Sequence, residues 1–312
     1  MILFYGRTQG NSGPDNVNRQ IYAHLSSGFL PAGKGHFLRD LAMLLRCDGL
    51  LVSGLSRRGC VLTWAAKRLG KTTVYLLHGC AAWEAEVNGM EAKAPIRQER
   101  YLMAACDRIL TVSGSYRDFL ARRYPACAPK LGFWYPGIPE LTACAGSEKV
   151  PGSILAAGAD RPLKNNLSLA RAVEELAGAF TLEICGAACR EDFLEDFSHS
   201  RYLGLLPQEE YWRKLAETEI FVVNSTRESF GISPLEALNR GCSLLVSRGA
   251  GICELLNLEE MDRIENPLDT EELKSKLLWI HHHPNHSRLA LPKRSWDDAV
   301  AELARLCEGG RP

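Results

Sequence analysis

The stretch IFVVNSTRESFGISPLEALNRGCSLLV, residues 220–246, contains the pattern that decides the fold of this chain. An apolar run at 220–223 is followed by a polar loop, a helix-length segment at 235–240 and a second, largely apolar run at 243–246. Apolar strands separated by a helix are typical of parallel sheets that are covered on both faces. The stretch therefore predicts an α/β fold.

The same alternation of short apolar runs and helix-length segments continues through most of the sequence. The predicted strands are residues 2–5, 49–52, 73–77, 108–112, 154–157, 181–185, 220–223 and 243–246. The predicted helices are residues 37–45, 61–69, 116–123, 167–176, 209–216 and 235–240. Because ligands bind beyond the carboxyl ends of the strands in open parallel sheets, we expect the loops that follow the strands to line the binding site.

Chain length and turn-forming residues indicate two domains. With 312 residues, the chain is about twice the size of a usual single domain. A break is expected near 136–153, where glycine, proline and small residues are frequent. We predict two doubly wound, Rossmann-like domains facing each other across a cleft, over 1–145 and 146–295. A C-terminal helix over 296–312 could pack back on the first domain.

Composition and charge exclude several classes of protein. Lys plus Arg and Asp plus Glu each number 37, and this zero net charge argues against a nucleic-acid partner bound by bulk charge. No run approaches the roughly 18 apolar residues of a membrane-spanning helix, and we expect no signal peptide because the N-terminus lacks a basic leader. The 11 cysteines form no CxxC pair, so we expect free thiols and a cytoplasmic protein.

Two common nucleotide-binding motifs are missing from the sequence. Gly6, Gly10 and Gly13 follow the first predicted strand, but their spacing is not that of the GxGxxG fingerprint. The segment 70–72 resembles the end of a P-loop, yet Ala65 stands where the first glycine belongs, and a strand follows rather than precedes. A bound nucleotide would therefore need another arrangement.

The loop and helix of the opening stretch resemble the signature of the retaining family-four glycosyltransferases, the glycosyl transferases of group 1, which have the two-domain GT-B fold. The family has two glutamates separated by seven residues, and Glu228 and Glu236 have this spacing, with Phe230 and Gly231 in register. Other segments are similar to family segments. They are 77–79, 107–113, 158–165 and 202–204, the last as a loop near the nucleotide base.

The resemblance implies a retaining hexosyltransferase that uses a nucleotide-diphosphate sugar in cell-surface polysaccharide biosynthesis. Its acceptor would be a hydroxyl of a glycan or of a lipid-linked sugar. Glu228 and His78 would position the sugar hydroxyls as catalytic residues, and Glu236 would bind the ribose. Backbone amides around the sugar would come from Ser229, Phe230 and Gly231. The acceptor hydroxyl would attack on the face from which the diphosphate leaves.

The chemistry of the leaving group indicates which other residues are needed. A nucleotide diphosphate leaves as at least a dianion, so a metal or fixed positive charge must stabilise it. No acidic cluster with metal-ligand spacing occurs in the predicted loops, so we expect no metal and no cofactor. Arg161 and Lys164 follow a predicted strand and are candidates for binding the phosphates. Amides of the Gly10–Gly13 loop and at the start of the helix after Gly231 would add donors.

Several of these residues also have purely structural interpretations. Residues 233–236, Ser-Pro-Leu-Glu, form a capping box in which Glu236 would cap a helix. A strand-end histidine such as His78 is often a hydrogen-bonded packing residue. The histidines between His281 and His286 have the composition of a metal site, but they fall outside the predicted loops, so we expect a surface cluster.

Two other functions stay open: a catalytically silent sugar-nucleotide-binding protein, and a GT-B sugar-nucleotide epimerase. Donor turnover separates the first from a transferase, and product formed without an acceptor identifies the second.

A membrane is a further candidate partner, because cations between Arg57 and Lys71 fall on one helical arc with Trp64 and fit weak contact with an anionic surface. An outer helix with solvated cations is the simpler interpretation.

Overall fold

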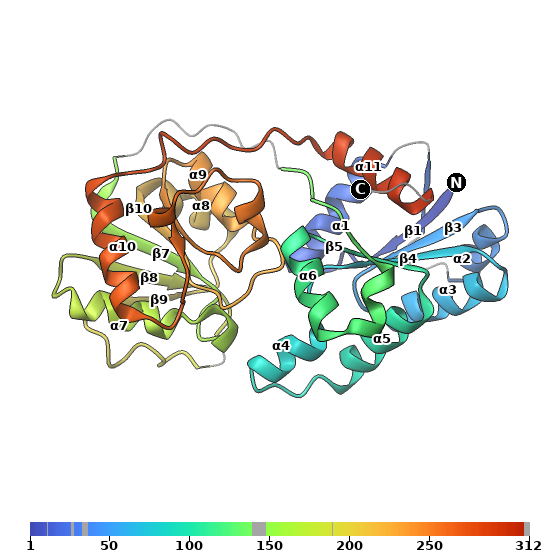
Figure 1. Cartoon of the computed structure of the whole chain (residues 1–312), viewed down its shortest axis with the longest axis horizontal. Helices are drawn as coiled ribbons and strands as arrows, with labels where there is room; N and C mark the ends of the chain where they lie inside the picture. The colour runs from blue at the N-terminus through green and yellow to red at the C-terminus, as the bar shows by residue number, and fades with distance from the viewer. Residues whose placement is uncertain (11, 26–27, 33–36, 139–147, 189, 309–312) are drawn as a thin grey trace. The chain divides into compact units, whose positions relative to one another are not determined.

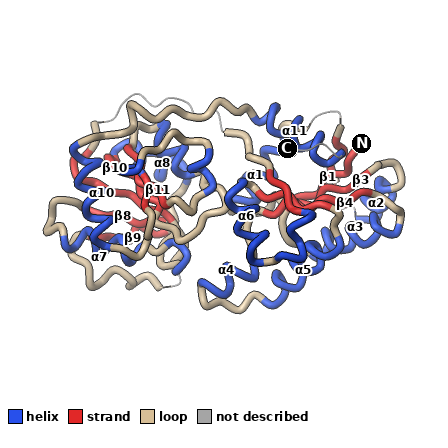
Figure 2. The backbone as a smooth tube through the Cα atoms, in the orientation of Figure 1, coloured by secondary structure: helices blue, strands red, loops and turns tan. Residues whose placement is uncertain are grey.

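The computed structural model describes residues 1–10, 12–25, 28–32, 37–138, 148–188 and 190–308. It contains two compact units: Met1–Pro139 together with Lys293–Pro312, and Glu140–Pro292. Each unit is built on a six-stranded parallel sheet with helices packed against it (Figures 1 and 2). The predicted α/β class, with two Rossmann-like domains, is confirmed.

The N-terminal unit has the sheet order β2-β1-β3-β4-β5-β6. Its strands are β1 (Ile2–Gly6), β2 (Phe29–Pro31), β3 (Gly49–Ser53), β4 (Thr72–Leu77), β5 (Arg108–Thr111) and β6 (Leu131–Phe133). Its helices are α1 (Gly13–Ala23), α2 (Phe37–Leu44), α3 (Arg57–Arg68), α4 (Ala81–Val87), α5 (Lys93–Ala105), α6 (Gly114–Arg123) and α11 (Trp296–Glu308). The chain reverses its direction of travel across the sheet between β1 and β3, which makes this pair the topological switch point.

The helix α11 comes from the end of the chain and packs on this first unit. The Trp134 indole Nε1 donates to the carbonyl oxygen of Ala299 over 2.7 Å, and Trp134 lies 6.3 Å from the Trp296 ring, centroid to centroid. A Cβ atom at Gly137 would lie 2.5 Å from the Trp296 ring, so only glycine allows this approach.

The C-terminal unit has the sheet order β12-β11-β10-β7-β8-β9. Its strands are β7 (Val150–Ala157), β8 (Thr181–Cys185), β9 (Ser200–Gly204), β10 (Thr218–Val223), β11 (Ser243–Ser247) and β12 (Arg263–Ile264). Its helices are α7 (Asn166–Glu175), α8 (Gln208–Glu217), α9 (Ser233–Asn239) and α10 (Thr270–His282). The switch point lies between β7 and β10, since β8 and β9 continue on one side and β11 and β12 on the other.

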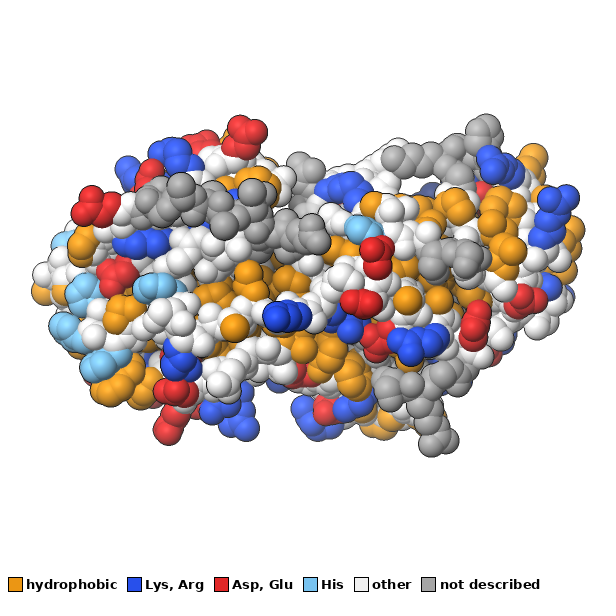
Figure 3. Space-filling model, turned by 90° about the horizontal axis from the view of Figure 1, so that it is seen from above, with side chains coloured by type: hydrophobic (Ala, Val, Ile, Leu, Met, Phe, Trp, Pro, Cys, Tyr) orange, Lys and Arg blue, Asp and Glu red, His pale blue; other side chains and the backbone are white. Residues whose placement is uncertain are grey.

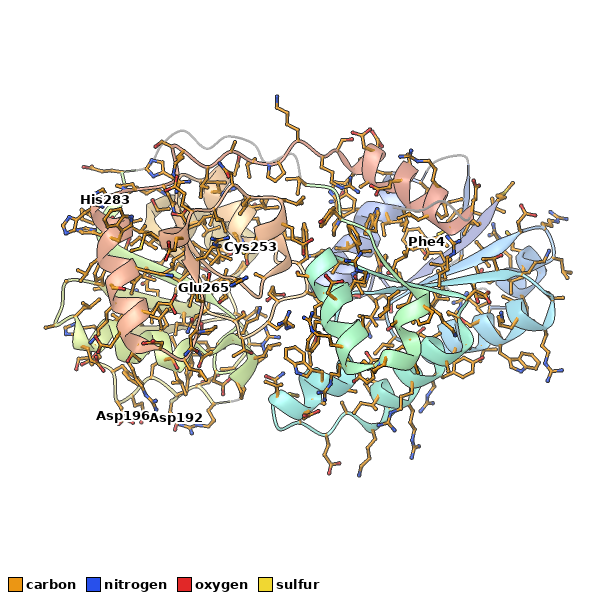
Figure 4. All side chains as sticks on the ribbon, viewed as in Figure 1. Phe4, Asp192, Asp196, Cys253, Glu265 and His283 are labelled. Carbon is orange, nitrogen blue, oxygen red and sulfur yellow. The ribbon has the colours of Figure 1, made fainter. Side chains whose placement is uncertain are left out.

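Apolar residues along the central strands form a separate core in each unit. Leu3 and Tyr75 are buried in the first core, and Ile154, Val222 and Leu245 in the second. The helices cover both faces of each sheet, so these strands carry apolar side chains on both faces. Figure 4 shows Phe4, another fully buried residue, within the N-terminal unit.

The prediction of a loop at 202–204 is wrong, because these residues belong to the strand β9. This strand lies at the edge of its sheet, where it pairs with β8 alone and keeps partly exposed residues such as Tyr202. An edge strand does not need an apolar sequence, so the pattern did not reveal it. Among the described residues the cysteines are free thiols, and Cys144 and Cys189 lie outside the described part.

Candidate functional site

The switch point of the C-terminal unit brings together two of the predicted site residues. Lys164 ends a short 3-10 helix, Pro162–Lys164, in the loop after β7, and Glu228 lies in the loop after β10. The Lys164 ammonium group forms a hydrogen-bonded ion pair with the Glu228 carboxylate. Their side chains are 18% and 21% exposed, so the pair is mostly shielded from solvent but reachable. A cation and a carboxylate at a switch point can bind an oxygen-rich, anionic ligand.

Backbone and amide hydrogen bonds hold these two loops against each other. The Thr226 amide donates to the carbonyl oxygen of Leu163 over 3.0 Å, and Asn224 Nδ2 donates to the carbonyl oxygen of Asn165 over 2.9 Å. Asn165 has the left-handed conformation, with φ +50°, which asparagine tolerates better than most residues. The loop that carries Lys164 is thus tied to the loop that carries Glu228.

Gly158 is required for the position of Lys164. Its φ of +107° is unfavourable for residues with a side chain, and a Cβ atom here would lie 2.4 Å from Lys164 Cγ. Arg161, the other predicted phosphate ligand, has an exposed side chain whose Nε donates to the carbonyl oxygen of Gly158 over 3.3 Å. Arg161 therefore lies in the same loop but outside the ion pair.

The loop that carries Glu228 is fixed on its other side by the segment after β11. The Glu228 amide donates to the carbonyl oxygen of Gly249, and the Gly251 amide donates back to that of Glu228 over 3.1 Å. Phe230 is buried, and its carbonyl oxygen accepts from the Ile252 amide over 2.8 Å. Ser229 is half-buried beside it. The loop is thus held in place by backbone contacts.

A hollow beside the ion pair is lined by residues of the same loops and of α9. Its empty volume is about 340 Å³, open solvent included, and its lining includes Lys164, Glu228, Gly231, Ser233 and Pro234. Gly231 has a φ of +93°, so a residue with a side chain would be strained here. Four of these five residues lie between 220 and 246, so that stretch supplies much of the wall.

Glu236 does not cap a helix, so the capping-box interpretation is wrong. The helix α9 begins at Ser233, and the residue before it, Ile232, already has helical dihedrals and makes no side-chain cap. Glu236 is half-buried near Trp212 and Arg240 of the same unit, and the Arg240 guanidinium lies 4.7 Å from the centre of the Trp212 ring. Burial raises the pKa of the Glu236 carboxyl, while the Trp212 indole and Arg240 act in the opposite direction.

In the N-terminal unit, His78 follows β4 directly and is 9% exposed. Its Nε2 lies 2.8 Å from the hydroxyl oxygen of Ser53, the last residue of β3. Burial lowers the pKa of His78 to about 4, although the nearby Asp15 carboxylate acts in the opposite direction. His78 is therefore a neutral, hydrogen-bonded imidazole near pH 7.

The glycine-rich loop after β1 leads into α1. Ser12 caps this helix by accepting a hydrogen bond from the Asp15 amide, and its hydroxyl donates to the Asp15 carboxylate. Gly10 has a φ of +142°, and a Cβ atom there would lie 2.6 Å from an Asp15 carboxylate oxygen. Gly13 begins α1 with open space around it, and Asn11 lies outside the described residues. Of these two glycines, Gly10 is thus required by the local packing and Gly13 is not.

Burial of Asp15 would raise the pKa of its carboxyl, but the hydrogen bonds from Ser12 and Arg7 outweigh this and hold the pKa below its usual value. This carboxylate was not predicted to matter, and neither was the helix α1, although residues 12–15, Ser-Gly-Pro-Asp, have the pattern of a helix start. Glu99 was also missed. It is buried in α5 and accepts hydrogen bonds from the amides of Ala81 and Ala82, which holds the segment just after His78.

The histidines near the end of α10 have separate environments. His281 Nδ1 lies 2.8 Å from a Glu219 carboxylate oxygen, and His283 stacks on Trp279 with ring centres 4.0 Å apart. Figure 4 shows His283 at the end of α10. His286 contacts the Ser243 hydroxyl instead. Within the described residues, no group of three or more His, Cys, Asp or Glu side chains could hold a metal ion.

Comparisons with known proteins match both units. The sequence profile described as "Glycosyl transferases group 1" matches residues 146–295, and the profile described as "Glycosyltransferase Family 4" matches residues 9–140. No curated protein matches the sequence.

Solved structures match the whole chain at low identity. HepE of Anabaena, crystallised with UDP-glucose, has 13% identity and a TM-score of 0.66, over 98% of this chain and 94% of HepE. A sucrose-phosphate synthase of Thermosynechococcus elongatus has 14% identity and a TM-score of 0.65, over 98% and 93%. WaaG, a glycosyltransferase involved in lipopolysaccharide biosynthesis, has 12% identity and a TM-score of 0.64, over 99% and 100%. These similarities establish the fold.

Proposed function

Because this chain belongs to the group 1, family-four glycosyltransferases and has their GT-B fold, we propose that it is a retaining hexosyltransferase. The donor is a nucleotide-diphosphate sugar, and the acceptor is a hydroxyl of a glycan or of a lipid-linked sugar. The proposed context is the biosynthesis of cell-surface polysaccharide. HepE was crystallised with UDP-glucose and a starch synthase of Arabidopsis thaliana with ADP, which supports a donor of this class.

The observation that carries the proposal is the ion pair of Lys164 and Glu228 at the switch point between β7 and β10. Lys164 can turn its charge from the carboxylate to the phosphates of a bound donor, with Arg161 adding a second cation from the same loop. Glu228, released from Lys164, accepts hydrogen bonds from sugar hydroxyls. Lys164 thus supplies a positive charge for the diphosphate, and Glu228 supplies a carboxylate for the sugar hydroxyls. The two charges compensate each other while no ligand is bound.

Other residues complete the proposed donor site. Glu236 binds the ribose, and the amides of Ser229, Phe230 and Gly231 contact the sugar. His78, Gly10 and Gly13 contribute from the N-terminal unit.

The proposed reaction keeps the configuration of the sugar by attack on a single face. The bond between the anomeric carbon and the diphosphate oxygen breaks, and a bond from that carbon to the acceptor oxygen forms. The acceptor proton moves to the departing diphosphate, so no protein nucleophile is needed. Lys164 and Arg161 stabilise the negative charge that develops on the diphosphate.

We propose that this stabilisation requires no metal and that the protein uses no cofactor. Activity should then survive EDTA, because the cations of the loop after β7 supply the field that a divalent ion would otherwise provide. Complete inhibition by EDTA, reversed by a divalent ion, would overturn this part of the proposal.

The test of the main proposal begins with binding. A thermal-shift panel of UDP, GDP, ADP and the corresponding nucleotide sugars identifies the donor. A ligand at one hundred times its dissociation constant stabilises the folded protein by about 2.7 kcal/mol. Turnover of that donor with and without added acceptors follows. Binding without turnover would indicate a silent binding protein, and a new sugar nucleotide formed without acceptor would indicate an epimerase.

Weak contact with an anionic membrane through the segment from Arg57 to Lys71 is also proposed. Trp64 is exposed on α3, with the Arg68 guanidinium 5.4 Å from its ring centre, and the neighbouring α2 exposes Leu38. Basic and hydrophobic side chains lie together at the end of the N-terminal unit that carries these helices (Figure 3). Lys67 is less available, because it pairs with Asp107 over 2.6 Å.

Each Lys or Arg side chain close to an anionic membrane surface contributes about 1 kcal/mol to the free energy of binding. No helix among the described residues is long and apolar enough to cross a membrane. Co-sedimentation with anionic and neutral vesicles at low and high salt tests the contact. Equally weak binding to both kinds of vesicle would refute it.

A further inference from the structure

A chain of buried hydrogen bonds connects the loop after β1 to His78. Asn18 Nδ2 donates to the carbonyl oxygen of Arg7 over 2.8 Å. The Ser53 hydroxyl donates to Asn18 Oδ1, and the same hydroxyl oxygen lies 2.8 Å from His78 Nε2. Asn18 and Ser53 are 1% and 2% exposed, so this chain is shielded from bulk water.

The chemistry of each group determines where the protons lie. The Arg7 carbonyl oxygen can only accept, so the Asn18 amide turns its NH2 group toward Arg7 and its oxygen toward Ser53. The amide oxygen also only accepts, so the single hydroxyl proton of Ser53 lies between Ser53 and Asn18. If the Ser53 hydroxyl proton pointed to His78 instead, the Ser53 and Asn18 oxygen atoms would be in contact with no proton between them. Ser53 is thus an acceptor toward His78, and the proton of that bond belongs to Nε2.

A neutral imidazole carries one proton, so Nδ1 of His78 keeps its lone pair. Near pH 7 the ring is neutral, because burial outweighs the influence of Asp15. Among the residues that the structure describes, Nδ1 has no hydrogen-bond partner. It is therefore available as an acceptor.

We infer that Asn18 and Ser53 are positioning residues that hold His78 as the Nε2–H tautomer, so that Nδ1 accepts a hydrogen bond from a hydroxyl group of the bound sugar. The tautomer follows from the hydrogen bonds alone, whereas the role toward the sugar rests on the proposed function. Gly6 takes part in this arrangement, since a Cβ atom there would lie 2.8 Å from Asn18 Cγ and push the amide away.

The tautomer can be measured directly in the intact protein. Long-range ¹H–¹⁵N correlation spectra of uniformly ¹⁵N-labelled protein distinguish protonated from unprotonated ring nitrogens. The signals of His78 are identified among the eight histidines by their loss in His78→Gln. We expect a single neutral form near pH 7 with the proton on Nε2. A proton on Nδ1 would overturn the inference, whatever the enzymatic activity.

A variant of Ser53 tests whether it acts through His78. Ser53→Ala leaves the buried Nε2–H group without its acceptor, so we expect a second tautomer in the spectrum and a fall in donor kcat/KM of about tenfold. The matched control is Ser247→Ala. Ser247 also ends a strand, β11, with the sequence Leu-Leu-Val-Ser, is fully buried, and donates to the carbonyl oxygen of Val223 over 2.6 Å. This control should leave the His78 signals unchanged.

A double-mutant cycle then separates positioning from a general loss of structure. In a His78→Ala background, Ser53→Ala should have no further effect on kcat/KM, because its target is gone. Equal fractional losses with and without His78 would show that Ser53 acts elsewhere and would refute its positioning role. Ser53→Thr keeps the hydroxyl, so a folded Ser53→Thr protein that lacks the single Nε2–H form would also contradict the inference.

The two levels of the proposal fail in different ways. If the parent protein turns over no sugar nucleotide, the proposed function and the role toward the sugar fail together. The spectrum still decides the tautomer in that case.

Discussion

Replacing Lys164 by alanine removes the cation of the ion pair at the switch point and leaves Glu228 uncompensated. Two unit charges about 4 Å apart attract each other by about 4 kcal/mol at an effective dielectric constant of 20. Removing one partner of a fully buried pair costs about 3–5 kcal/mol, and of an exposed pair at most about 1. Because these side chains keep 18% and 21% exposure, we expect Lys164→Ala to lower the free energy of unfolding by about 1–2 kcal/mol.

The C-terminal unit offers a matched control. Lys214 pairs with Glu183 over 2.6 Å, and these side chains are 22% and 19% exposed, close to the values of the first pair. Glu183 also pairs with Arg201, so it keeps one cation when Lys214 is removed. We therefore expect Lys214→Ala to destabilise the protein by about 1 kcal/mol or less.

Activity should distinguish the two variants far more than stability does. Lys164→Ala should lower kcat by about 10² to 10³, the scale of losing one donor that stabilises developing negative charge. Lys214→Ala should keep the activity of the parent, because Lys214 of α8 pairs with Glu183 of β8 and is not among the residues that line the hollow beside the ion pair. Urea unfolding followed by circular dichroism gives the stabilities, and release of the nucleoside diphosphate gives the rates.

Two results would refute this reasoning. Parent-like kcat in a folded Lys164→Ala protein would show that the lysine is purely structural. An equal loss of activity in both lysine variants would show that destabilisation alone accounts for it. The double variant Lys164→Met/Glu228→Gln should recover much of the stability, because no charge is left unpaired, but none of the activity.

Glu236→Ala should raise the Michaelis constant for the donor, because a ribose contact acts in ground and transition states alike, whereas Glu228→Ala should mainly lower kcat; unchanged steady-state kinetics in both would refute the assignment. Gly158→Ala should lower kcat and the melting temperature together, since the added Cβ atom would lie 2.4 Å from Lys164 Cγ; a normal melting curve would contradict this. For His78 the folded-state pKa of about 4 lies below the ordinary 6.5, so the unfolded chain binds more protons between these values. The neutral His78 therefore makes its full contribution to the free energy of unfolding above pH 6.5. About 3 kcal/mol of this contribution is lost as the pH falls toward 4. His78→Gln should therefore flatten the pH dependence of unfolding in this window, and an unchanged slope would exclude His78 as its source.

The pattern of apolar residues by itself determined the fold class. Strands buried on both faces of a sheet must be apolar along their length, so β1, β3, β4, β10 and others could be recognised from the sequence. The strands β2, β6, β9 and β12 were missed. They lie at the edges of the two sheets, and two of them have three residues and one has two. Short edge strands form by pairing with a neighbour already in place, which leaves no periodicity to detect.

Local sequence also indicated candidate site residues, since a residue just after a buried strand must lie at the edge of a parallel sheet, and the family resemblance added Glu236 within a helix. It did not determine which of them meet. Lys164 and Glu228 are 64 positions apart and form a pair only because β7 and β10 are neighbours in the sheet.

The same holds for Ser53 and His78, which face each other because β3 pairs with β4. In a similar way, Ile232 already has helical dihedrals before α9, and Glu236 lies near Trp212 and Arg240 rather than capping that helix. Strand order is set by the packing of whole elements over long distances along the chain, whereas periodicity reports only local burial. The candidate site residues could therefore be proposed from the sequence, whereas their partners were decided by the tertiary structure.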